Sequence, residues 1–417
     1  MCGAGEFRVP ICRDTDASLP GNRAFAMTWT PHTETELLDM VASARADSRT
    51  IEIVGRGTKR GLGRAIETTE ILDVSALSGI VRYEPDEFVI TARAATPIAE
   101  IEGAIAERRQ RMGFDPADWS GLFGSERNVA TIGGTVSADA CGSARIRHGA
   151  ARDHLLGYRS VNGLGEAYKA GGKVVKNVTG FDMPKLVCGA MGTLGVLTEV
   201  TLRLVPRARW PAVLMVRNAD TQTGFALLRR IWSSPLEATG LALVPKTALP
   251  AFPELGDAGN GAALIRLEGD AAVLEEKVQA ADLLLRPHEV ECPEVGDDIF
   301  TRIGAGAAFA NRGSAVWRIF VPPAQAAPCA DELAAQNWIG DWAGGAIWVE
   351  GGEPDSMQAL AARFDGFAQL MRGDTELRRH CDMFLPRSPI HRAVMQRVKA
   401  AFDPSGLFNP GRMFDGI

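Results

Sequence analysis

Several patterns that define common protein classes are missing from this sequence. Its seven cysteines contain no Cys-x-x-Cys pair, so the spacing that holds an iron–sulfur cluster is absent. No apolar run approaches the ~20 residues that a membrane-spanning helix needs. No Gly-Lys-Ser/Thr closes a kinase-type phosphate loop, and a net charge of −6 disfavours a nucleic-acid partner. We therefore expect a soluble enzyme-like chain that holds neither a cluster nor a metal.

The amino-terminal region lacks the apolar core of a signal peptide. Scattered cysteines suit a reducing compartment, so the expected location is the cytoplasm. Residues 1–27 are expected to be a poorly ordered extension, unless the natural start is Met27. A chain of 417 residues is expected to form two or three domains.

Glycine is plentiful, and three glycine-rich stretches occupy residues 54–63, 131–140 and 192–198. The first follows an apolar run, 50–54, that has strand character. A chain leaving a strand through such a turn exposes consecutive backbone N–H groups, which form a nest for a diphosphate. Arg56, Lys59 and Arg60 add positive charge beside it. Each stretch taken alone could also be an ordinary turn, because the chain contains 45 glycines.

The order of these stretches resembles the FAD-binding domain shared by vanillyl-alcohol-oxidase and p-cresol-methylhydroxylase flavoproteins, within their 2-hydroxy-acid branch. Three further segments carry the resemblance: Arg147-His148-Gly149 with Asp153, the run Lys176-Asn177-Val178-Thr179-Gly180-Phe181-Asp182-Met183, and the closing segment 403–413. The family's first loop holds the FAD pyrophosphate, its Gly-Gly segment passes along the flavin, and its Gly-Thr-Leu-Gly segment leads into a strand beside the adenine half.

The resemblance implies a set of residues that contact FAD. They are Gly55, Arg56, Gly57, Thr58, Lys59, Arg60, Gly61, Leu62, Thr131, Ile132, Gly133, Gly134, Ser137, Ala138, Arg147, Gly149, Asp153, Lys176, Gly192, Gly195, Val196 and Leu197. Small residues suit a flat ring, and Arg147, Lys176 and Lys185 are candidates for positive charge near flavin N1. The first loop carries Lys59 and Arg60 where tethered relatives have a histidine, so we expect non-covalent FAD.

The expected fold class is α+β. The resemblance implies a two-subdomain FAD-binding domain over 28–206, an α+β cap domain over 207–380, and a segment, 381–417, that packs back on the FAD domain. Residue patterns predict strands at 50–54, 70–74, 88–94, 155–161, 196–204, 212–216, 241–244, 262–267, 315–321 and 346–350. Helices are predicted at 33–46, 96–111, 223–232, 271–285, 331–337 and 355–371.

The cap lacks the histidine-rich metal element of relatives that oxidise D-2-hydroxy acids. His288, His380 and His391 are the only histidines between Pro206 and Ile417, and none has metal-ligand spacing. His380, near Asp382, is the best remaining base, although a structural role at a domain junction is the simpler interpretation. Trp338, Trp342 and Trp348 are more typical of a core than of a partner surface.

These features are most similar to the small flavin subunits of bacterial complexes that oxidise glycolate to glyoxylate. The resemblance implies two partners, a larger related flavin subunit and an iron–sulfur subunit, and through them a place at the inner face of the membrane. Two alternatives stay open. One is a self-sufficient FAD-dependent oxidoreductase for another small hydroxy acid or alcohol, and the other is a non-catalytic flavin-binding scaffold.

Overall fold

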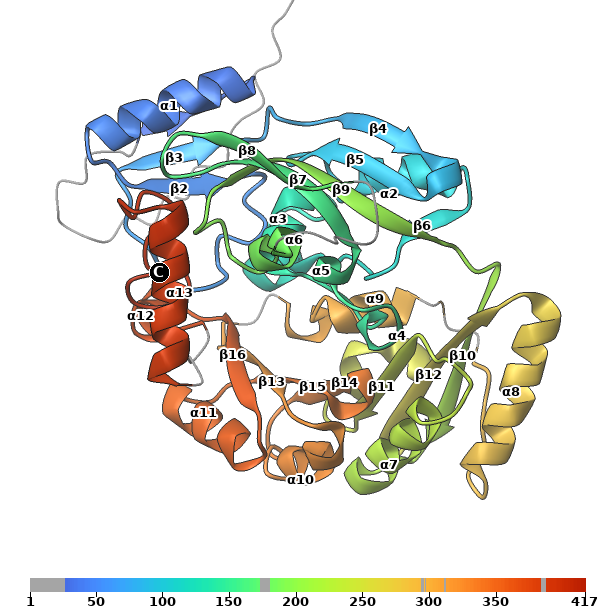
Figure 1. Cartoon of the computed structure of the whole chain (residues 1–417). Coiled ribbons are helices and arrows are strands. Elements are labelled where there is room, and N and C mark those ends of the chain that lie inside the picture. Colours follow the sequence, from blue (N-terminus) through green and yellow to red (C-terminus); the bar gives the residue numbers. More distant parts are fainter. Residues whose placement is uncertain (1–26, 173–180, 294–295, 297, 311–312, 384–387) are drawn as a thin grey trace, which may run out of the picture.

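The computed structural model describes residues 27–172, 181–293, 296, 298–310, 313–383 and 388–417. The prediction for residues 1–26 and the assignment of Lys176 therefore lie outside the described residues. The described strands form three sheets: two lie in the upper half of Figure 1, and the third fills the lower half. Helices accompany all three sheets, which confirms the expected α+β class.

The first sheet is small and parallel, in the order β1-β3-β2. It contains β1 (Met27–Trp29), β2 (Ile51–Val54) and β3 (Glu70–Asp73), and helix α1 (Glu34–Ala46) covers it. Helix α1 begins as its sequence predicts, because the side chain of Thr33 accepts a hydrogen bond from the Glu36 amide at 3.1 Å. Leu37 and Val41 bury its inner face against Leu72 and Ile51. The β2–β3 connection is the first glycine-rich loop.

The second sheet is antiparallel, in the order β4-β5-β9-β7-β8, with β6 beside β9. Its strands are β4 (Ile80–Glu84), β5 (Val89–Arg93), β6 (Gln110–Met112), β7 (Leu155–Val161), β8 (Ala167–Gly171) and β9 (Val196–Pro206). Its helices are α2 (Ile98–Ala106), α3 (Ile132–Ala138), α4 (Arg145–His148), α5 (Ala151–His154) and α6 (Met183–Val187). The helix predicted for 96–111 is too long, because Gln110 to Met112 pair with β9 instead.

The third sheet is antiparallel, in the order β10-β12-β11-β14-β15-β13-β16. Its strands are β10 (Trp210–Arg217), β11 (Gly240–Pro245), β12 (Gly261–Gly269), β13 (Val316–Phe320), β14 (Trp338–Asp341), β15 (Ala346–Glu350) and β16 (Phe367–Arg372). Helices α7 (Thr221–Trp232), α8 (Ala271–Leu285), α10 (Ala326–Asp331) and α11 (Pro354–Arg363) cover its outer face, and α9 (Asp298–Gly304) lies on the inner side.

Two predictions for this third sheet are wrong. The helix predicted at 331–337 instead spans Ala326–Asp331, with Pro328 in its first turn, where a missing N–H is tolerated. The helix predicted at 355–371 ends at Arg363, and strand β16 follows. Asp365 has φ of 56°, and a Cβ on Gly366 would lie 2.2 Å from the Phe320 carbonyl oxygen, so the chain makes a tight turn there.

Trp338 and Trp348 are core residues, as the sequence indicated, whereas Trp342 is partly buried. Trp338 is 2% exposed and packs with the outer helices, whereas Trp348 is fully buried on the opposite face of the sheet. That opposite face meets the part of the chain that forms the first two sheets, and Ala140, Met191 and Leu62 belong to the same hydrophobic cluster as Trp348. One sheet therefore separates two cores, of which the inner one joins the domains.

The chain then passes through α12 (Thr375–His380) and α13 (Pro389–Phe402) along the left side of Figure 1 and returns to the first sheet. The Ile51 amide donates to the Leu407 carbonyl oxygen at 2.8 Å, and the Asn409 amide donates to the Ile51 carbonyl oxygen at 2.9 Å. Lys399 is buried and its Nζ donates to Asp403 Oδ2 at 2.7 Å and to the Thr193 carbonyl oxygen at 2.7 Å. The carboxyl-terminal segment thus extends the sheet from which the first loop leaves.

Single-turn 3₁₀ helices complete the described structure. They are η1 (Pro85–Glu87), η2 (Trp119–Phe123), η3 (Leu249–Ala251), η4 (Pro253–Leu255), η5 (Ala307–Phe309), η6 (Pro323–Gln325) and η7 (Trp342–Gly344). Of these, η2 and η5 contact each other across the junction between the FAD domain and the cap.

Candidate cofactor-binding site

A cavity of about 90 Å³ lies where the first glycine-rich loop meets helix α3. Ten of the residues predicted to contact FAD line it: Gly55, Arg56, Gly57, Thr58, Lys59, Arg60, Thr131, Gly134, Ser137 and Ala138. Two segments that are more than 70 residues apart in the sequence therefore form one site. Ile53, Val54, Met191, Asn409 and Arg412 complete its lining.

The loop offers free backbone donors to this cavity. Within the described chain, the N–H groups of Arg56, Gly57, Thr58 and Lys59 donate to no other group. Gly57 adopts φ of 70°, a left-handed conformation that glycine takes without strain. Consecutive free N–H groups in such a turn form a nest for an anion. The loop geometry therefore fits a diphosphate.

Lys59 supplies the positive charge of this site. Its Nζ is buried and has no hydrogen-bond partner among the described residues. Burial lowers the pKa of Lys59 to about 8, against an opposing effect of the nearby Asp118 carboxylate. A buried ammonium without a partner is costly, and a bound anion would satisfy it. The free Nζ is a second, independent observation that fits the pyrophosphate of FAD.

Arg60, in contrast, pairs with a carboxylate of the protein itself. Its Nε donates to Glu52 Oε1 at 3.0 Å, and its Nη2 forms an ion pair with the same carboxylate. Arg56 is exposed at the rim. Of the three cations that the sequence places in the loop, Lys59 is thus the one whose charged group is buried without a partner.

Helix α3 forms the opposite wall. Thr131 caps it, accepting a hydrogen bond from the Gly134 amide at 3.2 Å. Gly134, Ser137 and Ala138 line the cavity, which agrees with the need for small residues against a flat ring. Gly133 does not line it: a Cβ at Gly133 would lie 2.7 Å from the Ala94 carbonyl oxygen. That glycine therefore permits close packing of α3 against the strand side of the domain.

The carboxyl-terminal segment supplies cavity residues that the sequence interpretation missed. Asn409 Oδ1 accepts a hydrogen bond from the Ile53 amide at 2.9 Å, and its Nδ2 donates to the Met191 carbonyl oxygen at 2.7 Å. A Cβ at Gly192 would approach Asn409 Nδ2 to 2.7 Å. Gly192 thus makes room for Asn409 instead of lining the cavity. The closing segment 403–413, which contains Asn409 and Arg412, was identified from the sequence. These two residues were not assigned to the cofactor site.

Two arginines donate hydrogen bonds to backbone carbonyl groups of the loop. Arg412 Nη2 and Arg378 Nη2 each donate to the Arg60 carbonyl oxygen at 2.9 Å, and Arg378 Nε donates to the Gly63 carbonyl oxygen at 2.9 Å. Arg412 also lies 3.6 Å from Glu52, and burial lowers its pKa to about 10. These bonds hold the loop in its conformation beside the cavity.

Several residues predicted to contact FAD lie elsewhere in the described structure. Arg147 pairs with Glu237 of the cap, and the exposed Lys185 pairs with Asp182 at 3.0 Å. Asp153 closes a local turn by accepting from the Ala150 amide at 2.9 Å. The remaining residues of this group do not line the cavity: Gly61, Leu62, Ile132, Gly149, Gly195, Val196 and Leu197. Most of them pack in the core or form tight turns.

His380, the candidate base, is also absent from the cavity lining. Its side chain is 76% exposed and its Nε2 lies 3.2 Å from Glu376 Oε1 on the same helix. Asp382, its expected neighbour, is instead bound by Arg64 Nη1 at 2.8 Å. Within the described residues, no three side chains of the metal-ligating types gather in one place.

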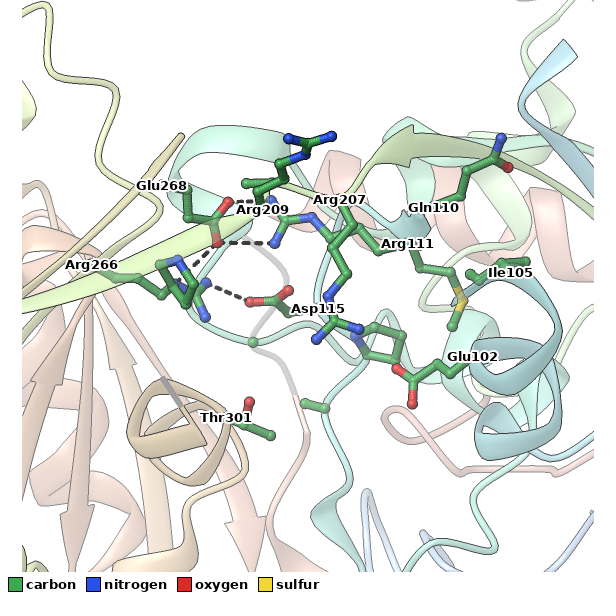
Figure 2. A pocket seen from close by; sticks show the side chains of 16 residues that line it. Glu102, Ile105, Gln110, Arg111, Asp115, Arg207, Arg209, Arg266, Glu268 and Thr301 are labelled. Atoms are coloured by element: carbon green, nitrogen blue, oxygen red, sulfur yellow. Dashed lines mark hydrogen bonds and ion pairs between the residues drawn. The ribbon is translucent and has the colours of Figure 1, made fainter. Parts of the chain in front are cut away.

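A larger cavity of about 370 Å³ lies between the FAD domain and the cap, on the side of β6 and β10. Figure 2 shows Arg111 directed at Glu268 and Arg266 directed at Asp115; the shortest N–O distances are 2.6 Å and 2.7 Å. Each pair joins one domain to the other. Burial raises the pKa of Glu102, also in this lining, against an opposing effect of Arg207. These cross-domain pairs hold the cap in place.

Comparisons with known proteins agree with this geometry. The family described as "FAD binding domain" matches residues 25–171, and the family described as "FAD linked oxidases, C-terminal domain" matches residues 379–413. The first match contains the loop and α3, whereas the second contains Asn409 and Arg412. Both matched segments contribute to the small cavity, and FAD is confirmed as the cofactor.

Individual relatives resemble the chain over most of its length. Glycolate oxidase subunit GlcE of Escherichia coli (strain K12) is 33% identical over 381 residues, which is 91% of this chain and 96% of that protein. Glycolate oxidase subunit GlcD of Bacillus subtilis (strain 168) is 23% identical over 404 residues, covering 87% and 84%. The crystal structure of p-cresol methylhydroxylase has a TM-score of 0.69 at 13% identity, covering 93% and 88% of the two chains, and shows a shared fold.

Proposed function

This chain belongs to the family of FAD-linked oxidoreductases that includes the glycolate oxidase subunit GlcE of Escherichia coli, and we propose that it is the FAD-binding subunit of a complex that oxidises glycolate to glyoxylate. The binding of FAD is supported by one observation: the first loop combines free backbone N–H groups with a Lys59 Nζ that has no partner among the described residues. The substrate part rests on the likeness to relatives named for glycolate oxidation.

Each part of the site has a task under this proposal. The amides of Arg56 to Lys59 and the Lys59 ammonium bind the pyrophosphate, and the small residues of α3 lie against the rest of the cofactor. Arg378 and Arg412 hold the loop in its binding conformation. Bound FAD supplies the acceptor for the hydride that leaves the alcohol carbon of the substrate. We propose that FAD is held without a covalent bond.

The electrons need a route out of the flavin, and we propose a larger flavin subunit and an iron–sulfur subunit as partners. The five described cysteines, Cys141, Cys188, Cys292, Cys329 and Cys381, are all free and separate. No helix within the described residues is long and apolar enough to span a bilayer. We further propose that the complex works in the cytoplasm, with any contact to the membrane face made through its partners.

A scaffold role without chemistry is the second candidate function. It is favoured by one specific observation: His380, the base that the sequence offered, is exposed and is not part of the cavity lining. Removal of a hydroxyl proton needs a base within hydrogen-bond reach. The same observation weighs against a self-sufficient oxidoreductase for another small hydroxy acid or alcohol.

The test is the absorbance spectrum of the purified chain, followed by anaerobic addition of glycolate, or of D-lactate, alone and with the partner subunits. We expect an oxidised flavin spectrum that glycolate bleaches when the partners are present. Lys59→Met is expected to bind flavin more weakly, whereas Lys169→Met, at an exposed position of β8, serves as the matched control. A chain that binds no flavin, or a reconstituted complex that glycolate does not reduce, would contradict the proposal.

A further inference from the structure

Arg318 occupies an unusual position on strand β13. It is 2% exposed and lies on the face of the cap sheet that meets the FAD domain. Its Cζ lies 4.2 Å from the ring centroid of Trp342 and 4.7 Å from that of Trp348. Cation–π contact stabilises a guanidinium between such rings but provides no hydrogen-bond acceptor in its plane. The arginine is therefore buried in the junction between the domains.

The guanidinium of Arg318 lacks the partner that a buried cation normally has. Within the described residues, its Nε and Nη2 make no hydrogen bond. Asp341 is one acidic neighbour, but its two oxygens already accept from Ser143 Oγ at 2.9 Å and from the Trp342 amide at 2.8 Å. Burial lowers the pKa of Arg318 to about 10. A buried charge in this state is unfavourable unless an anion joins it.

A third free donor lies beside Arg318. Trp348 is directly opposite Arg318 on the neighbouring strand β15, and its indole Nε1 is buried without a partner in the described structure. Three buried donors thus gather in one place without an acceptor. Buried polar groups are almost always satisfied, so an unmatched set of donors points to an acceptor-rich ligand.

Another buried arginine on the same sheet shows the contrast. Arg266 of β12 has Nη2 bonded to Asp115 at 2.7 Å and Nε bonded to Thr239 Oγ1 at 3.0 Å. Its burial is matched by acceptors from both domains. The unsatisfied state of Arg318 is therefore a property of its position and not of every buried arginine on this sheet.

The two Arg318 nitrogens that lack a hydrogen-bond partner among the described residues indicate which chemical group the ligand carries. Nε and Nη2 are the two nitrogens that present parallel N–H groups, and this fork matches both oxygens of one carboxylate. Trp348, the third donor, belongs to the same hydrophobic cluster as Ala140 and Met191, and Met191 lines the cofactor cavity. Asp139, the residue after Ala138 of the cavity lining, is close enough to Arg318 to oppose the lowering of its pKa, so the donors lie near the cavity.

We propose that Arg318 and Trp348 form a binding subsite for the carboxylate of a small 2-hydroxy acid, next to the cofactor. This inference rests on the proposed function, because it places the substrate of that reaction. Arg318 would pair with the carboxylate through Nε and Nη2, and Trp348 Nε1 would donate to the same group.

The experiment measures binding of oxalate, a small carboxylate that cannot be oxidised at an alcohol carbon, to the FAD-loaded chain by calorimetry. Arg318→Met is expected to weaken oxalate binding about 100-fold, because it removes one partner of a buried charge pair. FAD content should stay unchanged. The melting temperature without oxalate should not fall, because removal of a buried charge without a hydrogen-bond partner offsets the loss of its cation–π contacts.

Two further variants keep the test decisive if Arg318→Met fails to fold. Arg318→Lys keeps the charge without the fork and is expected to weaken oxalate binding about tenfold. Trp348→Phe removes only the indole donor and should weaken it several-fold. Arg266→Met is the control: it loses its ion pair with Asp115 and should melt earlier, yet bind oxalate normally. Glycolamide, which lacks the carboxylate charge, should bind weakly to all variants alike.

The outcomes separate this inference from the proposed function. Unchanged oxalate affinity in Arg318→Met and Arg318→Lys would overturn the subsite even if the reconstituted complex oxidises glycolate. Arg318-dependent oxalate binding in a complex that does not oxidise glycolate would support the subsite and contradict the proposed reaction.

Discussion

Arg412 Nη2 donates to the carbonyl oxygen of Arg60 at 2.9 Å, although 352 positions separate the two residues in the sequence. This bond links the end of the chain to the loop that offers its amides to the cofactor cavity. Cofactor binding is therefore expected to depend on residues of the carboxyl-terminal segment that do not carry its binding groups.

Arg412→Ala tests that dependence. It removes the bond to Arg60 and leaves the buried Glu52 with Arg60 as its remaining ion-pair partner. Loss of hydrogen bonds from a charged group costs about 1.5–3 kcal/mol. FAD affinity, measured by fluorescence titration, should fall about 10- to 100-fold. Arg397→Ala, at an exposed position of α13, is the control, and equal losses in the two variants would refute the loop-holding role.

The lowered pKa of Lys59 predicts that FAD binding depends on pH. Its pKa in the ligand-free protein is lowered to about 8, whereas a bound pyrophosphate favours the charged form. Below pH 8 the lysine is already protonated, so affinity should be constant; above pH 8 binding must take up a proton, and affinity should fall up to tenfold per pH unit. Calorimetry in buffers of different ionisation enthalpy measures that proton. Lys59→Met should abolish both the slope and the uptake.

The lowered pKa of Lys59 also predicts how the stability of the ligand-free protein depends on pH. Because the pKa of Lys59 is lower in the folded state than its ordinary value, the unfolded chain binds more protons between the two values. The free energy of unfolding should therefore rise as pH increases from about 8 toward about 10.5, and the rise should be smaller in Lys59→Met. A rise of the same size in that variant would show that other groups cause it.

Gly57→Asp should abolish FAD binding. Gly57 has φ of 70°, so any side chain is strained there, and a carboxylate would repel the pyrophosphate. Gly57→Ala is the matched control: it carries the backbone strain, about 1–3 kcal/mol, without the charge. It should bind FAD more weakly but measurably. Full flavin content in Gly57→Asp would show that the loop does not hold the cofactor.

Lys399→Met should destabilise the fold. Its Nζ bonds to Asp403, which is 1% exposed, and to the carbonyl oxygens of Thr193 and Phe408. Breaking a buried pair from one side costs about 3–5 kcal/mol, measurable by urea unfolding. Arg397→Met, exposed on the same helix α13, should change stability by no more than about 0.5 kcal/mol. Similar effects of the two substitutions would show that the bonds of Lys399 do not hold the carboxyl-terminal segment in place.

Local patterns in the sequence were sufficient for much of the fold. Helix α1 was predicted from Thr33 and Glu36, and β7, β15 and α8 were predicted with their observed ends, because periodicity and capping act over a few residues. Strand β16 was missed because its residues also fit a helical pattern. The tight turn at Asp365 and Gly366, and pairing with β13, decide its conformation.

The sequence by itself determined the glycine-rich loop, the small residues of α3 and the expected cofactor, because these signals are contiguous. Tertiary structure decided which of the loop's cations is free: Lys59 is left without a partner because Glu52, on β2, engages Arg60. It also decided that Asn409 and Arg412 join the site, and that Arg318 is buried without an acceptor while Arg266 has one. Such pairings join residues far apart in the chain, and only packing of the domains brings them within hydrogen-bond distance.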